Sequence, residues 1–171
     1  MNLPNRLTVL RVCMVPVFVV FMLWNGLGSS AKYVAAVIFI LASMTDWLDG
    51  YLARKNNLVT DFGKFMDPIA DKLLVCSAMI CLVEKGALPA WIVIIIIGRE
   101  FIISGFRLVA SDKGVVIAAS YWGKFKTVSQ MLMVILLILD LGGVFNTIAQ
   151  VLIWVALVLT VVSLVDYMVK N

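Results

Sequence analysis

Long apolar segments recur along the whole chain and are separated by short polar loops. A helix needs about 20 predominantly apolar residues to cross the roughly 30 Å of bilayer hydrocarbon. Six segments approach this length, at residues 7–25, 32–54, 66–83, 88–109, 122–140 and 146–168. The pattern predicts an all-α, polytopic membrane protein with six transmembrane helices. Residues 1–171 are expected to form a single membrane domain, because no polar linker or soluble module interrupts the series.

Composition agrees with this prediction. Hydrophobic residues make up 63% of the chain and charged residues 14%, whereas soluble domains are about one quarter charged. The first apolar segment lacks a small-residue cleavage site, so we expect it to remain as the first helix. Histidine is absent, which excludes imidazole-based triads and the commonest general base. Any catalysis must therefore depend on other groups.

Positive charge is divided unevenly between the two predicted sides of the membrane. One side would carry Arg6, Arg11, Arg54, Lys55, Lys64, Lys72, Arg107, Lys113, Lys124, Lys126 and Lys170. The other side would carry only Lys32 and Lys85. The positive-inside rule then places both termini in the cytoplasm. The basic face would meet anionic lipids of the bilayer, and this suffices to explain Lys113 and Lys126 as interfacial charges. No nucleic-acid partner is expected.

Four aspartates lie where the membrane pattern does not favour charge. Asp46 and Asp49 precede the end of the second segment and are three residues apart, on one helical face. Asp67 and Asp71 lie in the first two turns of the third segment and are four residues apart. A loop over residues 50–65 would bring the two pairs together at one depth.

Four carboxylates at one depth require compensation. At about 5 Å and an effective dielectric of about 20, two like charges repel by roughly 3 kcal/mol. An oxygen-only ligand set suits Mg²⁺ or Mn²⁺, and two such ions could clamp a diphosphate. The alternative is that the aspartates pair with Lys64, Lys72 or Arg54, or are protonated and hydrogen-bonded between helices.

The residues between the aspartates are small or polar. Gly50 and Ala53 are one turn apart and leave a strip where a ligand can approach closely. Thr60 and Gly63 would offer a hydroxyl and room for a base or a phosphate. Each of these features is ordinary by itself, and only their order around the aspartates makes them informative.

Residues 46–71 read DWLDGYLARKNNLVTDFGKFMDPIAD. This string fits the pattern D-x2-D-G-x2-A-R-x8-G-x3-D-x3-D at every fixed position and resembles the motif of the CDP-alcohol phosphotransferase family. The resemblance implies a six-helix membrane fold, a homodimer, and a site on the cytoplasmic side that cleaves the diphosphate of a CDP-linked lipid and releases CMP. It also implies location in a bacterial cell (plasma) membrane.

The resemblance assigns roles by position. It makes Asp46, Asp49 and Asp67 ligands of a two-metal centre holding Mg²⁺ or Mn²⁺, and makes Asp71 both a ligand and the general base. The positions expected to bind CDP-diacylglycerol are Asn5, Thr8, Gly50, Ala53, Arg54, Thr60 and Gly63. A carboxylate within reach of the acceptor hydroxyl would remove its proton as it attacks the β-phosphorus, which agrees with the role of Asp71.

The second half of the chain carries cations that predict the acceptor. Arg99 and Glu100 lie near the middle of the fourth segment, where a charge costs at least about 2.5 kcal/mol. Arg99, Arg107 and Lys124 together suggest a pocket for an anionic alcohol such as glycerol 3-phosphate. The strings REF, GFR, VIAA and GKFKT within residues 98–130 also resemble bacterial phosphatidylglycerophosphate synthases. Alternatively, Arg99 and Glu100 form a structural pair between helices.

Other functions remain open. Another acceptor, such as inositol phosphate, serine or phosphatidylglycerol, would keep the family but change the product. Intramembrane carboxylates also build cation or proton transporters, although these aspartates cluster at one edge and no internal repeat is found. A structural or assembly protein would leave the buried charges without a purpose.

Overall fold

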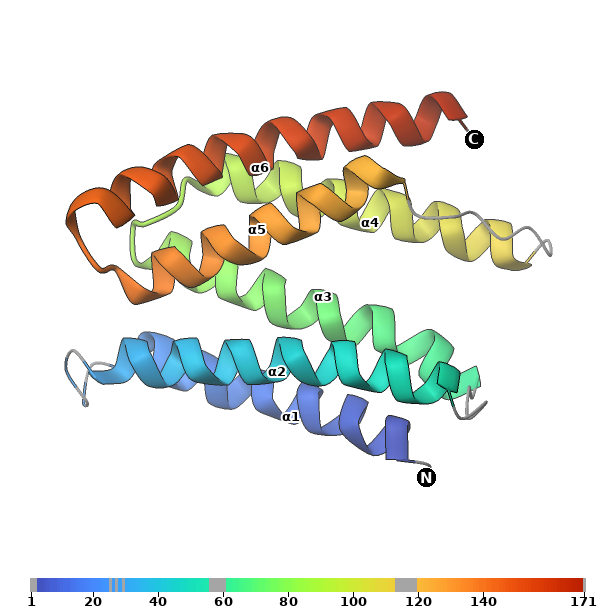
Figure 1. Cartoon of the computed structure of the whole chain (residues 1–171), viewed down its shortest axis with the longest axis horizontal. Coiled ribbons are helices and arrows are strands. Elements are labelled where there is room, and N and C mark those ends of the chain that lie inside the picture. The colour runs from blue at the N-terminus through green and yellow to red at the C-terminus, as the bar shows by residue number, and fades with distance from the viewer. Residues whose placement is uncertain are drawn as a thin grey trace. The chain divides into compact units, whose positions relative to one another are not determined.

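The computed structural model describes residues 3–24, 26, 28, 30–55, 61–112 and 120–170, with side chains except those of 3–7, 46–55, 61–68, 71, 111 and 112. These residues form six helices, labelled in Figure 1: α1 (Leu3–Leu23), α2 (Ser30–Lys55), α3 (Asp61–Glu84), α4 (Ala90–Asp112), α5 (Tyr121–Leu139) and α6 (Gly143–Lys170). No strand occurs among them. The prediction of an all-α fold is confirmed.

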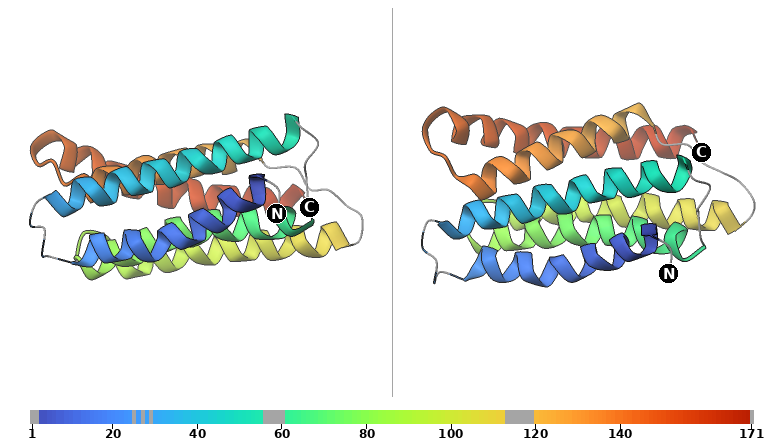
Figure 2. Two further views of the ribbon diagram at one scale, coloured as in Figure 1. Left: turned by 90° about the horizontal axis from the view of Figure 1, so that it is seen from below. Right: turned by 60° about the horizontal axis from the view of Figure 1, so that its bottom comes forward.

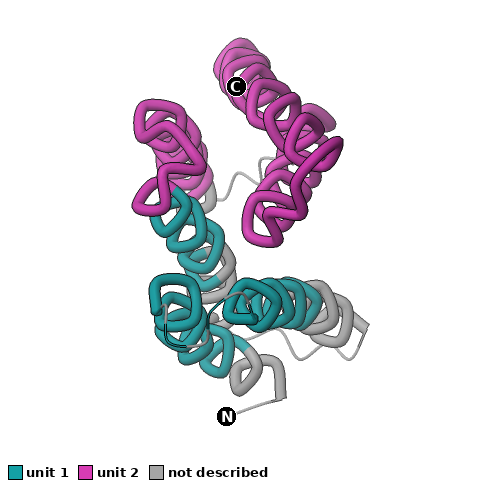
Figure 3. Tube along the Cα trace, turned by 90° about the vertical axis from the view of Figure 1, so that its left-hand side faces the viewer, with its two compact units in different colours: residues 1–82 teal, residues 83–171 magenta. Residues whose placement is uncertain are grey.

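The chain divides into two compact units, Met1–Leu82 and Val83–Asn171, which Figure 3 colours separately. The first contains the hairpin of α1 and α2 together with most of α3. The second contains α4, α5 and α6, and in it α6 packs against both α5 and α4. Each unit is described here by itself.

The α1–α2 hairpin is built from large side chains on one helix and small ones on the other. Val15, Phe18 and Met22 of α1 are buried, and so are Ala31 and Ala35 of α2, which leave room for them. A ring contact also joins the helices, with the Phe18 and Phe39 centroids 5.9 Å apart. Small residues on one helix allow the two backbones to approach closely, as is usual for helices that pack within a membrane.

The α5–α6 hairpin appears in orange and red in Figures 1 and 2, and a tight turn closes it. Asp140 ends α5 in the left-handed region, with φ 40°, and its N–H donates to the Leu136 carbonyl. Asn146 donates to the Asp140 carboxylate over 3.1 Å and accepts from the Gly142 N–H over 3.3 Å. Gly142 and Gly143 also have positive φ values, which glycine adopts without steric cost.

The connection between α2 and α3 is shorter than predicted. The sequence predicted a loop over residues 50–65, but α2 continues to Lys55 and α3 already begins at Asp61. Gly50 therefore does not end α2. At the start of α3, the acidic residue Asp61 suits the positive end of the helix dipole. Asp67 and Asp71 consequently lie about one turn farther into their helix than the prediction placed them.

Two helices are long and apolar enough to cross a membrane, Tyr121–Leu139 and Gly143–Lys170. Two apolar stretches are shorter, Thr8–Leu23 and Ser30–Thr45. α4 has sufficient length, but Arg99, Glu100 and Arg107 interrupt its apolar run. This holds for the residues that the structure describes, so the six-span topology stays a prediction.

Candidate active site

The four aspartates occupy helical positions that continue the buried faces of their helices. On α2, Ala35, Phe39 and Ala42 are fully buried, and positions 46 and 49 follow at the same three- and four-residue spacing. The first pair of aspartates therefore lies on the same face of α2 as the residues that pack on α1.

The same holds on α3. Ala70, Leu74 and Ala78 are buried, and positions 71 and 67 lie on the same side, about one and two turns before Leu74. A polar pair on an otherwise buried helical face is expected to face a partner or a ligand rather than lipid.

The predicted contacts of these residues are not tested. The side chains of Asp46, Asp49, Asp67 and Asp71 lie outside the described part, as do those of Asn5, Gly50, Ala53, Arg54 and Gly63, and Thr60 is outside it altogether. Among the described residues, no group of three or more His, Cys, Asp or Glu side chains could hold a metal ion. The donor set still fits a hard cation, since all four predicted ligands offer carboxylate oxygens.

The start of α1 contributes two buried polar residues to the same unit. Thr8 and Arg11 are each 1% exposed and lie one turn apart. The Arg11 Nε donates to the Ala42 carbonyl of α2 over 3.3 Å. Arg11 was predicted to lie on the basic cytoplasmic face, yet its side chain is fully buried against α2. Burying a charged group without a partner would be costly in free energy.

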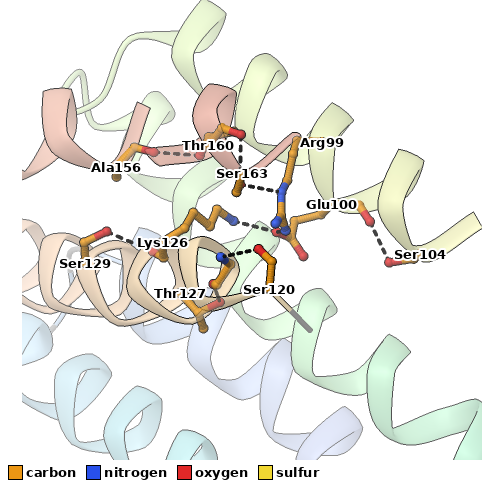
Figure 4. A network of polar contacts seen from close by, with 11 residues as sticks. Arg99, Glu100, Ser104, Ser120, Lys126, Thr127, Ser129, Ala156, Thr160 and Ser163 are labelled. Carbon is orange, nitrogen blue, oxygen red and sulfur yellow. Dashed lines mark hydrogen bonds and ion pairs between the residues drawn. The ribbon is translucent and has the colours of Figure 1, made fainter. Parts of the chain in front are cut away.

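In the second unit, a buried ionic network joins α4, α5 and α6 (Figure 4). The Glu100 Oε1 accepts from the Arg99 Nη1 over 2.7 Å and from the Lys126 Nζ over 2.6 Å. The Arg99 Nε donates to the Ser163 hydroxyl of α6 over 3.1 Å. One carboxylate oxygen therefore pairs with a cation from α4 and a cation from α5. The hydrogen bond from Arg99 to Ser163 connects this pair of helices to α6.

Smaller groups fix the position of this network. The Ser163 hydroxyl donates in turn to the Thr160 carbonyl over 3.0 Å. On α5, a Cβ added to Gly123 would lie 3.3 Å from the Arg99 Nη2, so glycine leaves the space that the guanidinium occupies. Ser120, the N-cap of α5, accepts from the Gly123 N–H and holds that first turn in place. Together, these contacts orient the planar guanidinium of Arg99.

Lys126 was predicted to be an interfacial charge, and this prediction is wrong. Its side chain is 2% exposed and is paired with Glu100. The signal was present in the sequence, because Lys126 lies on the α5 face of Gln130, Met133 and Val134, all of which are buried. Lys124 and Lys126 are two positions apart, which puts the two lysines on nearly opposite faces of a helix.

Arg107 and Lys124 make their described contacts elsewhere. Arg107 is exposed, and its Cζ lies 5.9 Å from the centre of the Tyr167 ring of α6. Lys124 is also exposed, and its Nζ lies 5.3 Å from the centre of the Tyr121 ring, on its own helix. Of the three predicted acceptor-binding residues, only Arg99 takes part in the buried network, so a common pocket stays a prediction.

The described part of the chain is all helical, and two of its helices are long and apolar enough to cross a membrane. Residues 1–162 match the CDP-alcohol phosphatidyltransferase family, and the chain belongs to that family. The resemblance carried by residues 46–71 is therefore confirmed.

Relatives with similar sequences match most of the chain. It is 51% identical over 148 residues to the CDP-diacylglycerol–glycerol-3-phosphate 3-phosphatidyltransferase of Bacillus subtilis, covering 81% of this chain and 77% of the relative. It is 44% identical to a probable phosphatidylglycerophosphate synthase of Mycobacterium tuberculosis, covering 99% of this chain and 81% of the relative. A Rickettsia typhi protein with the same name as the first is 44% identical over 142 residues, covering 83% of this chain and 79% of the relative.

The ionic network predicts a stability effect. Glu100→Gln leaves two buried cations without their shared carboxylate, and we expect a loss of about 3–5 kcal/mol in the free energy of unfolding. Reversible unfolding of the purified protein in detergent measures this loss. Glu84→Gln removes the same charge from an exposed helix end and should change stability by less than about 0.5 kcal/mol. Equal effects of the two substitutions would contradict the role of Glu100.

Proposed function

We propose that this chain transfers the phosphatidyl group of CDP-diacylglycerol to sn-glycerol 3-phosphate, giving phosphatidylglycerophosphate and CMP. The observation that carries the proposal is the complete aspartate motif over residues 46–71 in a chain of the CDP-alcohol phosphatidyltransferase family. The names of its relatives support the same pair of substrates. The enzyme is then a CDP-diacylglycerol-dependent phosphatidyltransferase of phospholipid biosynthesis.

Divalent metal binding follows from the same motif. Asp46, Asp49, Asp67 and Asp71 would hold two Mg²⁺ or Mn²⁺ ions, because their positions continue the buried faces of α2 and α3 and their oxygens suit hard cations. When bound, such ions neutralise the negative charge that develops on the diphosphate as CMP leaves.

The chain's own residues bind the donor and activate the acceptor. Asp71 accepts the proton of the attacking hydroxyl, and the oxygen so activated attacks the β-phosphorus of CDP-diacylglycerol. The nucleotide side of the donor meets Gly50, Ala53, Arg54, Thr60 and Gly63, with Asn5 and Thr8 of α1 near the same substrate. The burial of Thr8 within the α1–α2 hairpin supports the contribution of α1.

The acceptor is bound through its phosphate by Arg99, Arg107 and Lys124. A planar guanidinium suits phosphate because it can donate two parallel hydrogen bonds, and a fixed guanidinium loses less entropy when it does so. Glu100 and Ser163 hold Arg99 in one orientation, and Arg107 and Lys124 are exposed to an approaching anion. A neutral acceptor would need none of these cations, whereas inositol phosphate could use all of them.

The enzyme spans the bilayer of the cell membrane six times, forms a homodimer, and has both termini and its active site on the cytoplasmic side. The two long apolar helices support membrane insertion. The excess of lysine and arginine on the side assigned to the cytoplasm supports the orientation.

The base assignment predicts that Asp71→Asn lowers turnover by at least about 10²-fold, because an amide cannot accept the proton. CMP release from CDP-diacylglycerol with Mg²⁺ and glycerol 3-phosphate measures this loss. The matched control is Asp140→Asn at the exposed end of α5, where asparagine also tolerates the left-handed backbone. Full turnover by Asp71→Asn would refute the assignment.

The acceptor site predicts a selective effect at Arg107. Arg107→Ala removes a charge near the acceptor's phosphate, so the KM for glycerol 3-phosphate should rise about tenfold or more, with a smaller change in the KM for CDP-diacylglycerol. Steady-state kinetics with each substrate varied separately measures both constants. Lys170→Ala, at the exposed end of α6, removes an equal charge and should leave both constants unchanged. An equal rise in both constants for Arg107→Ala would contradict acceptor binding by this residue.

A further inference from the structure

Arg11 is a buried cation without an assigned role. Its side chain belongs to the largest that are fully buried, at 1% exposure, and it lies in the interface between α1 and α2. The Nε donates to the backbone carbonyl of Ala42 over 3.3 Å. An interfacial arginine would extend its charge into water, so this burial requires compensation within the protein.

The carbonyl that Arg11 contacts lies at the turn that leads to the aspartates. In a helix, the carbonyl of Ala42 also accepts the backbone N–H of Asp46, four residues on, and points toward that end of the helix. The guanidinium therefore lies one turn from the backbone of Asp46 along α2. The ring contact of Phe18 with Phe39 fixes the antiparallel register of the hairpin, so residues before Arg11 on α1 lie level with residues beyond Ala42 on α2.

Charge gives this placement a consequence. Positions 46 and 49 continue the α2 stripe that Ala42 belongs to, and positions 67 and 71 carry two further carboxylates in the same unit. Four carboxylates on buried helical faces repel one another whenever no metal is bound. A single permanent cation beside them lowers this repulsion, and arginine stays charged at every relevant pH.

We propose that Arg11 is a positioning residue that acts as a fixed counter-cation of the aspartate site. It stabilises the metal-free state and fixes the α2 turn before Asp46, and its positive charge weakens the binding of divalent ions. This inference rests on the metal site of the proposed function. The site would then release metal more easily than four aspartates alone would allow.

Mn²⁺ binding to the full-length protein in detergent, without CDP-diacylglycerol, tests the proposal. Electron paramagnetic resonance gives the dissociation constant from the free Mn²⁺ signal. Arg11→Gln keeps a donor of similar reach but removes the charge, so the Kd for Mn²⁺ should fall about tenfold or more. Arg11→Lys keeps the charge and should stay within about threefold of the unmodified protein.

Lys32→Gln is the matched control. It removes one positive charge from α2, the helix that carries Asp46. Position 32, however, lies about 21 Å along α2 from Asp46 at 1.5 Å per residue. Its Kd for Mn²⁺ should not change. An unchanged or higher Kd for Arg11→Gln would overturn the proposal. A purely structural arginine would leave the affinity for Mn²⁺ unaltered, and its replacement would lower the melting temperature equally with and without Mn²⁺.

Three further outcomes can be distinguished from one another. If Arg11→Gln does not fold, the double variant with Asp46→Asn removes one charge of each sign and should fold; its failure as well would contradict the proposal. If the unmodified protein transfers phosphatidyl groups and Arg11→Gln binds Mn²⁺ with the same Kd as the unmodified protein, only the role of Arg11 is refuted. If the unmodified protein binds no Mn²⁺, the proposed metal site and the role of Arg11 are both refuted.

Discussion

Charge inside an apolar helical protein must be compensated by groups that the chain supplies or binds, and this constraint governs both units. In the second unit, one oxygen of Glu100 accepts hydrogen bonds from Arg99 and Lys126, and Ser163 supplies a further contact. Three helices are thereby joined by contacts that no apolar side chain could replace without leaving a partner unpaired. In the first unit, buried Arg11 donates to the Ala42 carbonyl, one turn before the position of Asp46.

The two units use charge in opposite senses, which matches the chemistry of the proposed reaction. Carboxylates of α2 and α3 suit metal ions that bind the diphosphate of the donor, and cations of α4 and α5 suit the phosphate of the acceptor. A guanidinium whose orientation is fixed before binding costs little further entropy when the acceptor arrives. Under the proposed function, Glu100 would serve acceptor binding indirectly, by holding Arg99.

Much of the fold could be predicted because apolar segments of helical length leave few alternatives. Helix ends were harder: the third segment was expected to begin at residue 66, although α3 already begins at Asp61. Among the candidate site residues, the aspartate motif was found from spacing alone. The burial of Arg11 and Lys126 was missed because each was counted as one of many cytoplasmic cations, whereas the helical face that each shares with apolar residues indicates burial.

The most direct measurement is product formation by the purified protein in detergent with CDP-diacylglycerol and Mg²⁺, comparing glycerol 3-phosphate with inositol phosphate, serine and phosphatidylglycerol. The account predicts CMP release and phosphatidylglycerophosphate with glycerol 3-phosphate alone, abolished by a chelator and restored by Mg²⁺ or Mn²⁺. Release with serine or phosphatidylglycerol would contradict the role given to Arg99, Arg107 and Lys124, whereas release with inositol phosphate would change the acceptor and leave that role in place. Absence of CMP release with every acceptor would contradict the proposed enzyme activity itself.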